Sequence, residues 1–156
     1  MRRKDREVTD QNRIGEILKR CEICRVGVCD QGEVYIVPLN FGLDERDGRW
    51  IFYFHGAKEG RKMALVAQNP RVGLELETGY RVRGGEVACE WTASFESVIG
   101  NGVASVVTDR EEKIHGLRRI MAQVSGKDHW DFAEKMLEAV CVWKIEVENL
   151  SCKVHE

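Results

Sequence analysis

The chain has 156 residues, of which 43% are apolar, and its 24 basic and 26 acidic side chains give a formal charge of −2. The apolar share is too high for an intrinsically disordered chain, and the length suits one domain spanning residues 1–156. The near-neutral charge argues against a general nucleic-acid-binding protein. No apolar run approaches the roughly 20 residues that a membrane-spanning helix needs, so we expect no membrane protein.

The N-terminus predicts the cellular compartment. Residues Met1–Arg6 are mostly basic, and no apolar segment follows them. This pattern lacks the apolar region of a secretory signal peptide, so the sequence predicts a cytoplasmic protein. Cysteines in that compartment stay mostly reduced, and we expect the six cysteines of this chain to be mostly free thiols.

Cys21 and Cys24 have the CxxC spacing that occurs in zinc and redox sites. Zinc would need two further ligands, and the sequence has no second CxxC and no paired histidine motif. A thioredoxin-type pair would begin a helix, whereas this pair closes a predicted one. We therefore interpret both residues as small buried thiols. His115, His129 and His155 also lack metal-ligand spacing, so we expect no metal site.

The first part of the chain predicts one helix followed by strands. Ile14, Ile17 and Leu18 form one apolar stripe, which indicates a helix over 10–21. Strands are expected over 25–29, 34–41 and 50–55, with a turn at 30–32 and a polar hairpin loop at 44–49. The 34–41 strand is apolar on both alternating faces, so we expect both faces to be covered. Pro38 within it indicates a strand edge or a bulge.

The remaining chain alternates helices and longer strands. The expected elements are a helix over 58–68, a strand over 71–78, a basic loop over 79–85, one or two strands over 86–107 with an interruption near 100–102, a helix from 109, a helix over 131–140 and a strand over 141–147. Strands dominate and follow one another in meander-like runs. The sequence therefore predicts a mainly β, α+β fold, with an antiparallel barrel and peripheral helices.

Basic residues gather where the 50–55 strand gives way to the next helix. Gly56 ends the strand, and Lys58, Gly60, Arg61 and Lys62 follow in the first turns. Cations are unfavourable at a helix N-terminus unless an anion lies there. Free N–H groups, glycine and basic side chains together suit a phosphate. The alternative is a solvated basic helix face. The spacing matches neither a Walker loop nor a dinucleotide GxGxxG motif.

Two more segments could serve a ligand. The segment VYIVPLNF offers an apolar slot with an amide at its edge, which suits a planar heteroaromatic ligand, although a plain core strand is the alternative. His55 could donate a proton or hydrogen-bond a ligand or the backbone. The stretch 91–104 mixes aromatics, hydroxyls and glycines. Ser94 and Ser97 share one strand face only if a bulge separates them, and a strand with a turn is the alternative.

Taken together, these segments resemble a known family. The matching pieces are MRRKDREVTD, VYIVPLNFG, FYFHGAKEGRK, NPRVGLELE and WTASFESVIGNGVA with the DREEK helix that follows. They resemble the pyridoxamine 5′-phosphate oxidase-like, FMN-binding split β-barrel family, in its nitroimidazole-resistance branch. The resemblance implies a six-stranded antiparallel split β-barrel that forms homodimers. It also implies two FMN molecules in the dimer interface, each contacted by both chains.

The resemblance assigns a site to this chain. Arg61 and Lys62 match the phosphate-binding pair, and the segment 37–40 matches the strand behind the isoalloxazine ring. Ser97 departs from the family, which often has glutamine there. Together with the residue pattern, the resemblance to this family implies the cofactor-binding residues Val37, Pro38, Leu39, Asn40, Phe54, His55, Gly56, Lys58, Gly60, Arg61, Lys62, Trp91, Ser94 and Ser97.

The activity implied by the resemblance is that of an FMN-dependent oxidoreductase, with nitro-aromatic compounds such as nitroimidazoles among its substrates. His55 aligns with a histidine near the flavin and is the candidate proton donor or substrate contact. A second possible function is that of a flavin-binding carrier or redox-sensing module without turnover. A third is that of a haem-binding protein built on the same barrel. The sequence names neither the physiological substrate nor the electron donor.

Overall fold

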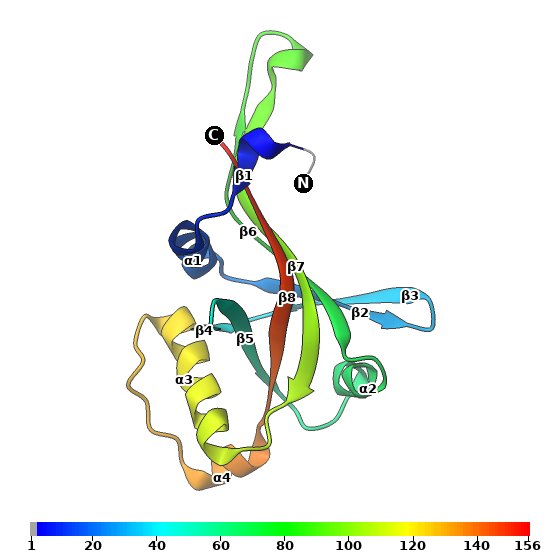
Figure 1. The fold of residues 1–156 in the computed structure, drawn as a ribbon, viewed down its shortest axis with the longest axis vertical. Helices are drawn as coiled ribbons and strands as arrows, with labels where there is room; N and C mark the ends of the chain where they lie inside the picture. Colours follow the sequence, from blue (N-terminus) through cyan, green and yellow to red (C-terminus); the bar gives the residue numbers. More distant parts are fainter. Residues whose placement is uncertain (1–2) are drawn as a thin grey trace.

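The computed structural model describes residues 3–156. They form one antiparallel sheet in the order β3-β2-β6-β7-β8-β5-β4, with β1 paired to β8 (Figure 1). The strands are β1 (Glu7–Val8), β2 (Cys24–Asp30), β3 (Glu33–Leu39), β4 (Gly42–Arg46), β5 (Arg49–Gly56), β6 (Arg71–Arg83), β7 (Thr92–Val106) and β8 (Cys141–His155). The helices are α1 (Gln11–Arg20), α2 (Arg61–Gln68), α3 (Arg110–Ser125) and α4 (Glu134–Ala139), with 3-10 turns at Lys4–Arg6 and Ala88–Glu90.

The predicted class, mainly β with peripheral helices, is confirmed. The sheet contains eight strands instead of six, because residues 7–8 and 42–46 also join it. Strands β3 and β4 stand at the two ends of the pairing order, and the described residues show no ladder between them. Helix α3 lies beside β4 and β5, with α4 below it near the start of β8, whereas α2 lies on the other side of the sheet beside β2 and β7 (Figure 1).

Three long strands, β6, β7 and β8, form the centre of the sheet. The β6–β7 hairpin extends beyond the other strands and forms one end of the molecule (Figure 1). The expected loop over 79–85 was wrong, because β6 continues to Arg83 after a register shift between Thr78 and Arg81. The expected break near 100–102 is a register shift between Asn101 and Gly102 within a continuous β7. A bulge adds an unpaired residue to one strand without ending it, and the extra residue lies in β6 at the first shift and is Glu148 of β8 at the second.

Other boundaries also differ from the expected ones. The final strand runs to His155 because its second half pairs with β7 up to Phe95. Strand β7 begins only at Thr92, after the 3-10 turn at Ala88–Glu90. The helix expected from 58 begins only at Arg61, because Gly60 has a φ of 129°, which lies outside the helical region. The helix expected over 131–140 is limited to Glu134–Ala139.

The residues 44–49, expected as a loop, belong largely to β4 and the start of β5. Their charges do not prevent a strand because they meet partners on α3. Asp44 lies 2.8 Å from the Nε2 atom of His115, and Arg119 donates to the carbonyl of Leu43. Helix α3 comes so close to β4 that a Cβ at Gly42 would overlap the backbone of Ile120.

Strand β3 corrects another expectation. Both of its faces were expected to be covered, but within residues 3–156 β3 pairs only with β2 and is an edge strand. Val37 and Leu39 pack against the core. Val34 and Ile36 point outward and are 70% and 61% exposed. The apolar pattern of both faces therefore reflects one face in the core and one apolar face at the surface.

The core lies between α1, α2 and the sheet. Ile17 and Leu18 of α1 and Phe54 of β5 are fully buried, and the ring of Phe54 stacks on Trp143 with 4.4 Å between centroids. Asp10 caps α1 by accepting a hydrogen bond from the backbone of Arg13. None of the described helices combines the length and the apolar character needed to cross a membrane.

Cysteines 21, 24 and 152 lie in this core, and Cys29 and Cys89 are exposed. Burial raises the pKa of Cys21 to about 12 and that of Cys152 to about 11, and it raises the pKa of Cys24 further. A thiol with a raised pKa reacts slowly because little thiolate is present. The CxxC pair is therefore packed as buried thiols, and no group of three or more His, Cys, Asp or Glu side chains in residues 3–156 is placed to hold a metal ion.

We expect iodoacetamide to modify two cysteines of the native protein rapidly, Cys29 and Cys89, and to modify Cys21 and Cys24 only after unfolding. Peptide mass spectrometry over a time course measures each site separately. The Cys29→Ser/Cys89→Ser variant serves as the control and should show no fast phase. Fast labelling of Cys21 or Cys24 in that variant would contradict the buried interpretation.

Candidate functional site

The candidate site begins where β5 ends at Gly56. A short exposed loop, residues 57–60, leads to α2, which begins at Arg61. No side chain caps this helix in the described structure, and its first turn contains no acidic residue. The first N–H groups of a helix lack partners within the helix and carry its positive dipole end. The N-terminus of α2 is therefore electropositive and lacks a side-chain cap.

Arg61 ties this helix to the β2–β3 hairpin. Its Nη2 donates to Oδ2 of Asp30 at 2.9 Å, and its guanidinium carbon lies 4.6 Å from the centre of the Tyr35 ring. Asp30 precedes the tight turn of the hairpin, in which Gln31 and Gly32 have φ of 52° and 94°. Arg61 thus places the N-terminus of α2 against the turn end of the β2–β3 hairpin. The segment 37–40 lies further along β3 from this contact.

Lys62 occupies a different environment. It is half-buried, and its Nζ lies 5.7 Å from the centre of the Trp143 ring. A Cβ at Gly56 would lie 3.2 Å from that Nζ, so the ammonium rests over the bare backbone at the end of β5. Burial lowers the pKa of Lys62, although the neighbouring thiol of Cys141 opposes this effect. No carboxylate in residues 3–156 lies within ion-pair distance of it.

The other residues predicted near this junction differ in their access to solvent. His55 is exposed and lies opposite Val142 in the β5–β8 ladder. Phe54 is fully buried and points to the opposite face of β5, where its ring stacks on Trp143. Lys58 is exposed in the loop. Pro38 on β3 and Asn40, which follows the strand, are exposed, and Pro38 lies opposite Arg25 in the ladder to β2. The position of Pro38 on an edge strand matches the expectation from its missing N–H.

Three of the predicted cofactor-binding residues lie outside this junction in the fold. Trp91 is 60% exposed in the β6–β7 hairpin, where its ring packs on Gly84. Ser94 donates to the carbonyl of Arg81, and Ser97 lies opposite Glu77 and Lys153 within the sheet. This hairpin and α2 lie in opposite halves of the molecule (Figure 1). A single chain therefore does not bring Trp91 and Ser94 to Arg61 and Lys62.

Sequence reasoning missed three residues of the junction: Asp30, Tyr35 and Trp143. Asp30 carried only a turn signal, and nothing in the local sequence indicated its pairing with Arg61. Tyr35 alternates with Val37 and Leu39, which could have placed its ring on the inner face of β3. Trp143 lies in the alternating segment CVWKIEV, whose inward residues could have been tested for contact with the aromatic strand β5.

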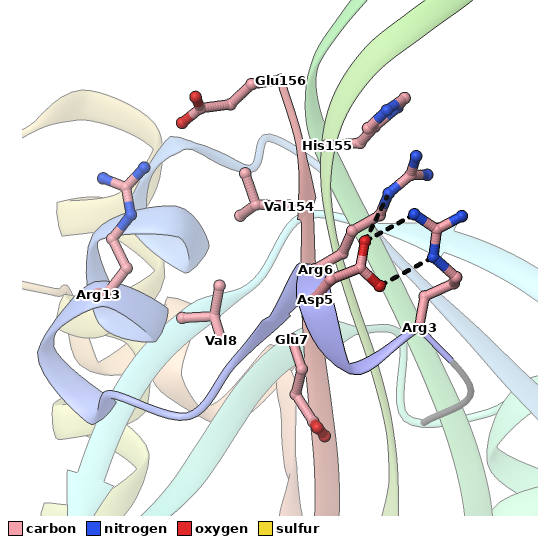
Figure 2. Close-up of a pocket in the computed structure, with 9 residues that line it drawn as sticks. All are labelled: Arg3, Asp5, Arg6, Glu7, Val8, Arg13, Val154, His155 and Glu156. Atoms are coloured by element: carbon pink, nitrogen blue, oxygen red, sulfur yellow. Dashed lines mark hydrogen bonds and ion pairs between the residues drawn. The ribbon is translucent and has the colours of Figure 1, made fainter.

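A pocket of about 520 Å³ lies away from this junction, between the N-terminal segment and the end of β8 (Figure 2). Figure 2 shows Arg3 and Arg6 turned toward the carboxylate of Asp5, with which both form ion pairs. Arg13, set apart from them, pairs with Glu16 and Glu96. The basic side chains of this pocket are thus already neutralised. None of the predicted cofactor-binding residues lines it.

Comparison with known proteins supports the resemblance drawn from the motifs. Residues 10–154 match the sequence profile of the pyridoxamine 5′-phosphate oxidase family. A proposed 5-nitroimidazole antibiotic resistance protein of Bacteroides thetaiotaomicron is 31% identical, with a TM-score of 0.81 over 95% of this chain and 86% of that one. No curated protein sequence matches the chain.

Two more distant structures share the fold. The flavocytochrome Anf3 of Azotobacter vinelandii is 23% identical, with a TM-score of 0.79 over 100% of this chain and 72% of that one. A FAD- and haem-binding protein of Mycobacterium smegmatis is 17% identical, with a TM-score of 0.81 over 97% and 74%. The profile match covers nearly the whole chain, and the Bacteroides structure agrees in sequence as well as in fold. The chain belongs to the pyridoxamine 5′-phosphate oxidase family.

Proposed function

We propose that this protein binds flavin mononucleotide at the junction of β5, α2 and β3 and acts as an FMN-dependent oxidoreductase. The observation that carries the proposal is the uncapped N-terminus of α2, with the unpaired ammonium of Lys62 beside it and Arg61 joining it to β3. Family membership and the flavin-binding proteins among the structural neighbours, including a FAD-binding protein of Mesorhizobium loti, support the same cofactor class.

The residues present fit a terminal phosphate. Two cations and the free N–H groups of a helix match the charge and the acceptor oxygens of a phosphate dianion. Gly60 leaves the backbone open to close approach, and Gly56 leaves room for the ammonium of Lys62. Each charge-assisted hydrogen bond contributes about 1.5–3 kcal/mol. With Tyr35 of β3 beside Arg61, we place the ring of the flavin along β3 toward Val37–Asn40, where burial at about 25 cal/mol per Å² would bring the affinity to the micromolar range or below.

The chemistry of the reaction belongs to the flavin, which when bound supplies hydride or single-electron transfer. The protein holds the phosphate through Arg61 and Lys62, orients the ring along β3 and limits access of water. Nitro-aromatic compounds are the proposed substrates, supported by the 31% identical Bacteroides protein. FMN is proposed over FAD because two cations at one helix end suit a terminal dianion better than the singly charged diesters of a pyrophosphate bridge.

The site is proposed to be shared by two copies of the chain. Trp91 and Ser94 lie on the projecting β6–β7 hairpin, in the opposite half of the molecule from α2, whereas Ser97 lies further along β7, opposite Lys153 of β8. The hairpin exposes Tyr80, Val82 and Trp91, which are 62%, 55% and 60% accessible. A homodimer in which each hairpin reaches the partner's junction would cover these apolar side chains and complete the site.

The test is gel filtration of FMN-supplemented protein with light scattering and absorbance read on the same peak. The proposal expects flavin absorbance to travel with a particle of two chains. Flavin absent from the protein peak would reject the cofactor assignment, and flavin on a single-chain particle would reject the shared site. Retention of FAD in preference to FMN would favour FAD as the cofactor, and a Soret band after haem supplementation would favour haem.

His55 is proposed as the proton donor or substrate contact, since it is the exposed titratable side chain at the end of β5. We expect His55→Ala to leave FMN affinity within about threefold and to slow oxidation of the reduced, FMN-loaded protein by a nitroimidazole about a hundredfold. Stopped-flow absorbance measures this rate. His129→Ala removes a fully exposed histidine as the control. Equal rates in both variants would remove His55 from the reaction, and no acceleration by the parent protein would favour a flavin carrier or sensor.

A further inference from the structure

The half-buried lysines in residues 3–156 differ in their partners. Of these, Lys62, Lys113 and Lys153 form no ion pairs, whereas Lys144 forms two, with its Nζ 2.9 Å from Glu112 and 3.2 Å from Glu146. Buried lysines are normally paired in this way because an unpaired buried charge is costly. Within residues 3–156, Lys62 has no such carboxylate, and its nearest charged or aromatic partner is the ring of Trp143. Its positive charge is therefore not neutralised.

Trp143 is rigidly held below that ammonium. Its side chain is fully buried, its ring stacks on Phe54 at 4.4 Å, and the two residues lie opposite each other in the β5–β8 ladder. Its indole N–H has no hydrogen-bond partner among the described residues, so no hydrogen bond fixes the ring and packing alone holds it. An aromatic face at this distance attracts a cation.

Gly56 completes the arrangement. It lies opposite Cys141 at the end of the same ladder, and a side chain there would meet the ammonium of Lys62. The strand end is thus open above Trp143, and the lysine lies across it. Arg61 differs, because its guanidinium is already engaged by Asp30. The two basic residues of the pair are therefore not equivalent.

We infer that Trp143 and Gly56 are positioning residues that hold the Lys62 ammonium for an anion, and that Lys62, more than Arg61, sets the preference of the site for a phosphorylated flavin over riboflavin. This inference rests on the proposed function. It adds two residues outside the basic loop to the phosphate site, one of them buried and distant in sequence.

The test compares the affinities of FMN and riboflavin, which differ only in the phosphate, for the full-length protein by flavin fluorescence titration. Trp143→Leu should weaken FMN about tenfold and leave riboflavin within about twofold. Trp143→Phe, which keeps an aromatic face, should recover most of the FMN affinity. In the Lys62→Met background, Trp143→Leu should have no further effect on FMN, because its effect acts through the lysine.

Gly56→Ala provides a second variant at the surface, in case Trp143→Leu does not fold. It should displace the ammonium and cause the same selective loss of FMN affinity. Equal weakening of FMN and riboflavin in both variants, or a further FMN loss in the Lys62→Met background, would overturn the inference. So would wild-type selectivity in Trp143→Leu and Gly56→Ala. Failure of the parent protein to bind either flavin would instead overturn the proposed function, and the inference with it.

Discussion

Replacing Arg61 and Lys62 together with alanine is expected to lower FMN affinity about a hundredfold and to leave riboflavin affinity within about twofold. The two side chains supply the charged contacts proposed for the phosphate, and each such contact contributes about 1.5–3 kcal/mol. Riboflavin lacks the phosphate, so it loses little. The fold should persist, because the Arg61–Asp30 ion pair is exposed and cations at a helix N-terminus do not stabilise it.

The measurement is a fluorescence titration of each flavin with the variant and the parent protein. The control is Lys127→Ala/Lys135→Ala, which removes two positive charges from exposed positions outside the junction. It separates local contacts from the effect of net charge, and its FMN affinity should match that of the parent. Parent-like FMN affinity in the Arg61→Ala/Lys62→Ala variant would show that the phosphate, if bound, lies elsewhere.

The second large effect is expected at Gly42, where β4 meets α3. A methyl group there would overlap the backbone nitrogen of Ile120 and the backbone of Arg119, and backbone atoms cannot move aside as a flexible side chain can. We expect Gly42→Ala to lower the free energy of unfolding by about 3 kcal/mol, at the upper end of overpacking substitutions. Urea denaturation followed by circular dichroism measures the change.

Gly27→Ala is the matched control. Gly27 also lies in a strand, and a Cβ there would make only an ordinary contact with Val34. Its unfolding free energy should stay within about 0.5 kcal/mol of the parent value. Similar stability of Gly42→Ala and Gly27→Ala would contradict the close packing of α3 on β4.

The local elements of this fold were largely predictable from the sequence. The apolar stripe of α1 and the aromatic strand β5 both carry signals within a few residues of each other. The long-range pairing register of the strands was not predictable in this way. Residues 44–46 read as a polar loop because their partners, His115 and Glu112, come from a helix about seventy residues later. Only the folded sheet shows that these charges are paired.

The same distinction applies to the site. Clustered cations and glycines marked the N-terminus of α2, because helix-end chemistry is local in sequence. The contacts of Arg61 with Asp30 and Tyr35, and of Lys62 with Trp143, join residues 26 to 81 positions apart along the chain, and no spacing rule connects them. The distance of Trp91 and Ser94 from α2 likewise depends on the length of the β6–β7 hairpin, of which residues 79–85 were expected to be a loop.

The central claim is that the junction of β5, α2 and β3 binds a flavin through its phosphate, and an equilibrium titration of the purified protein with FMN and riboflavin tests it most directly. We predict saturation at one FMN per chain with micromolar or tighter affinity, and riboflavin binding at least tenfold weaker. Equal affinity for the two flavins, or no saturation by FMN in the millimolar range, would contradict the account.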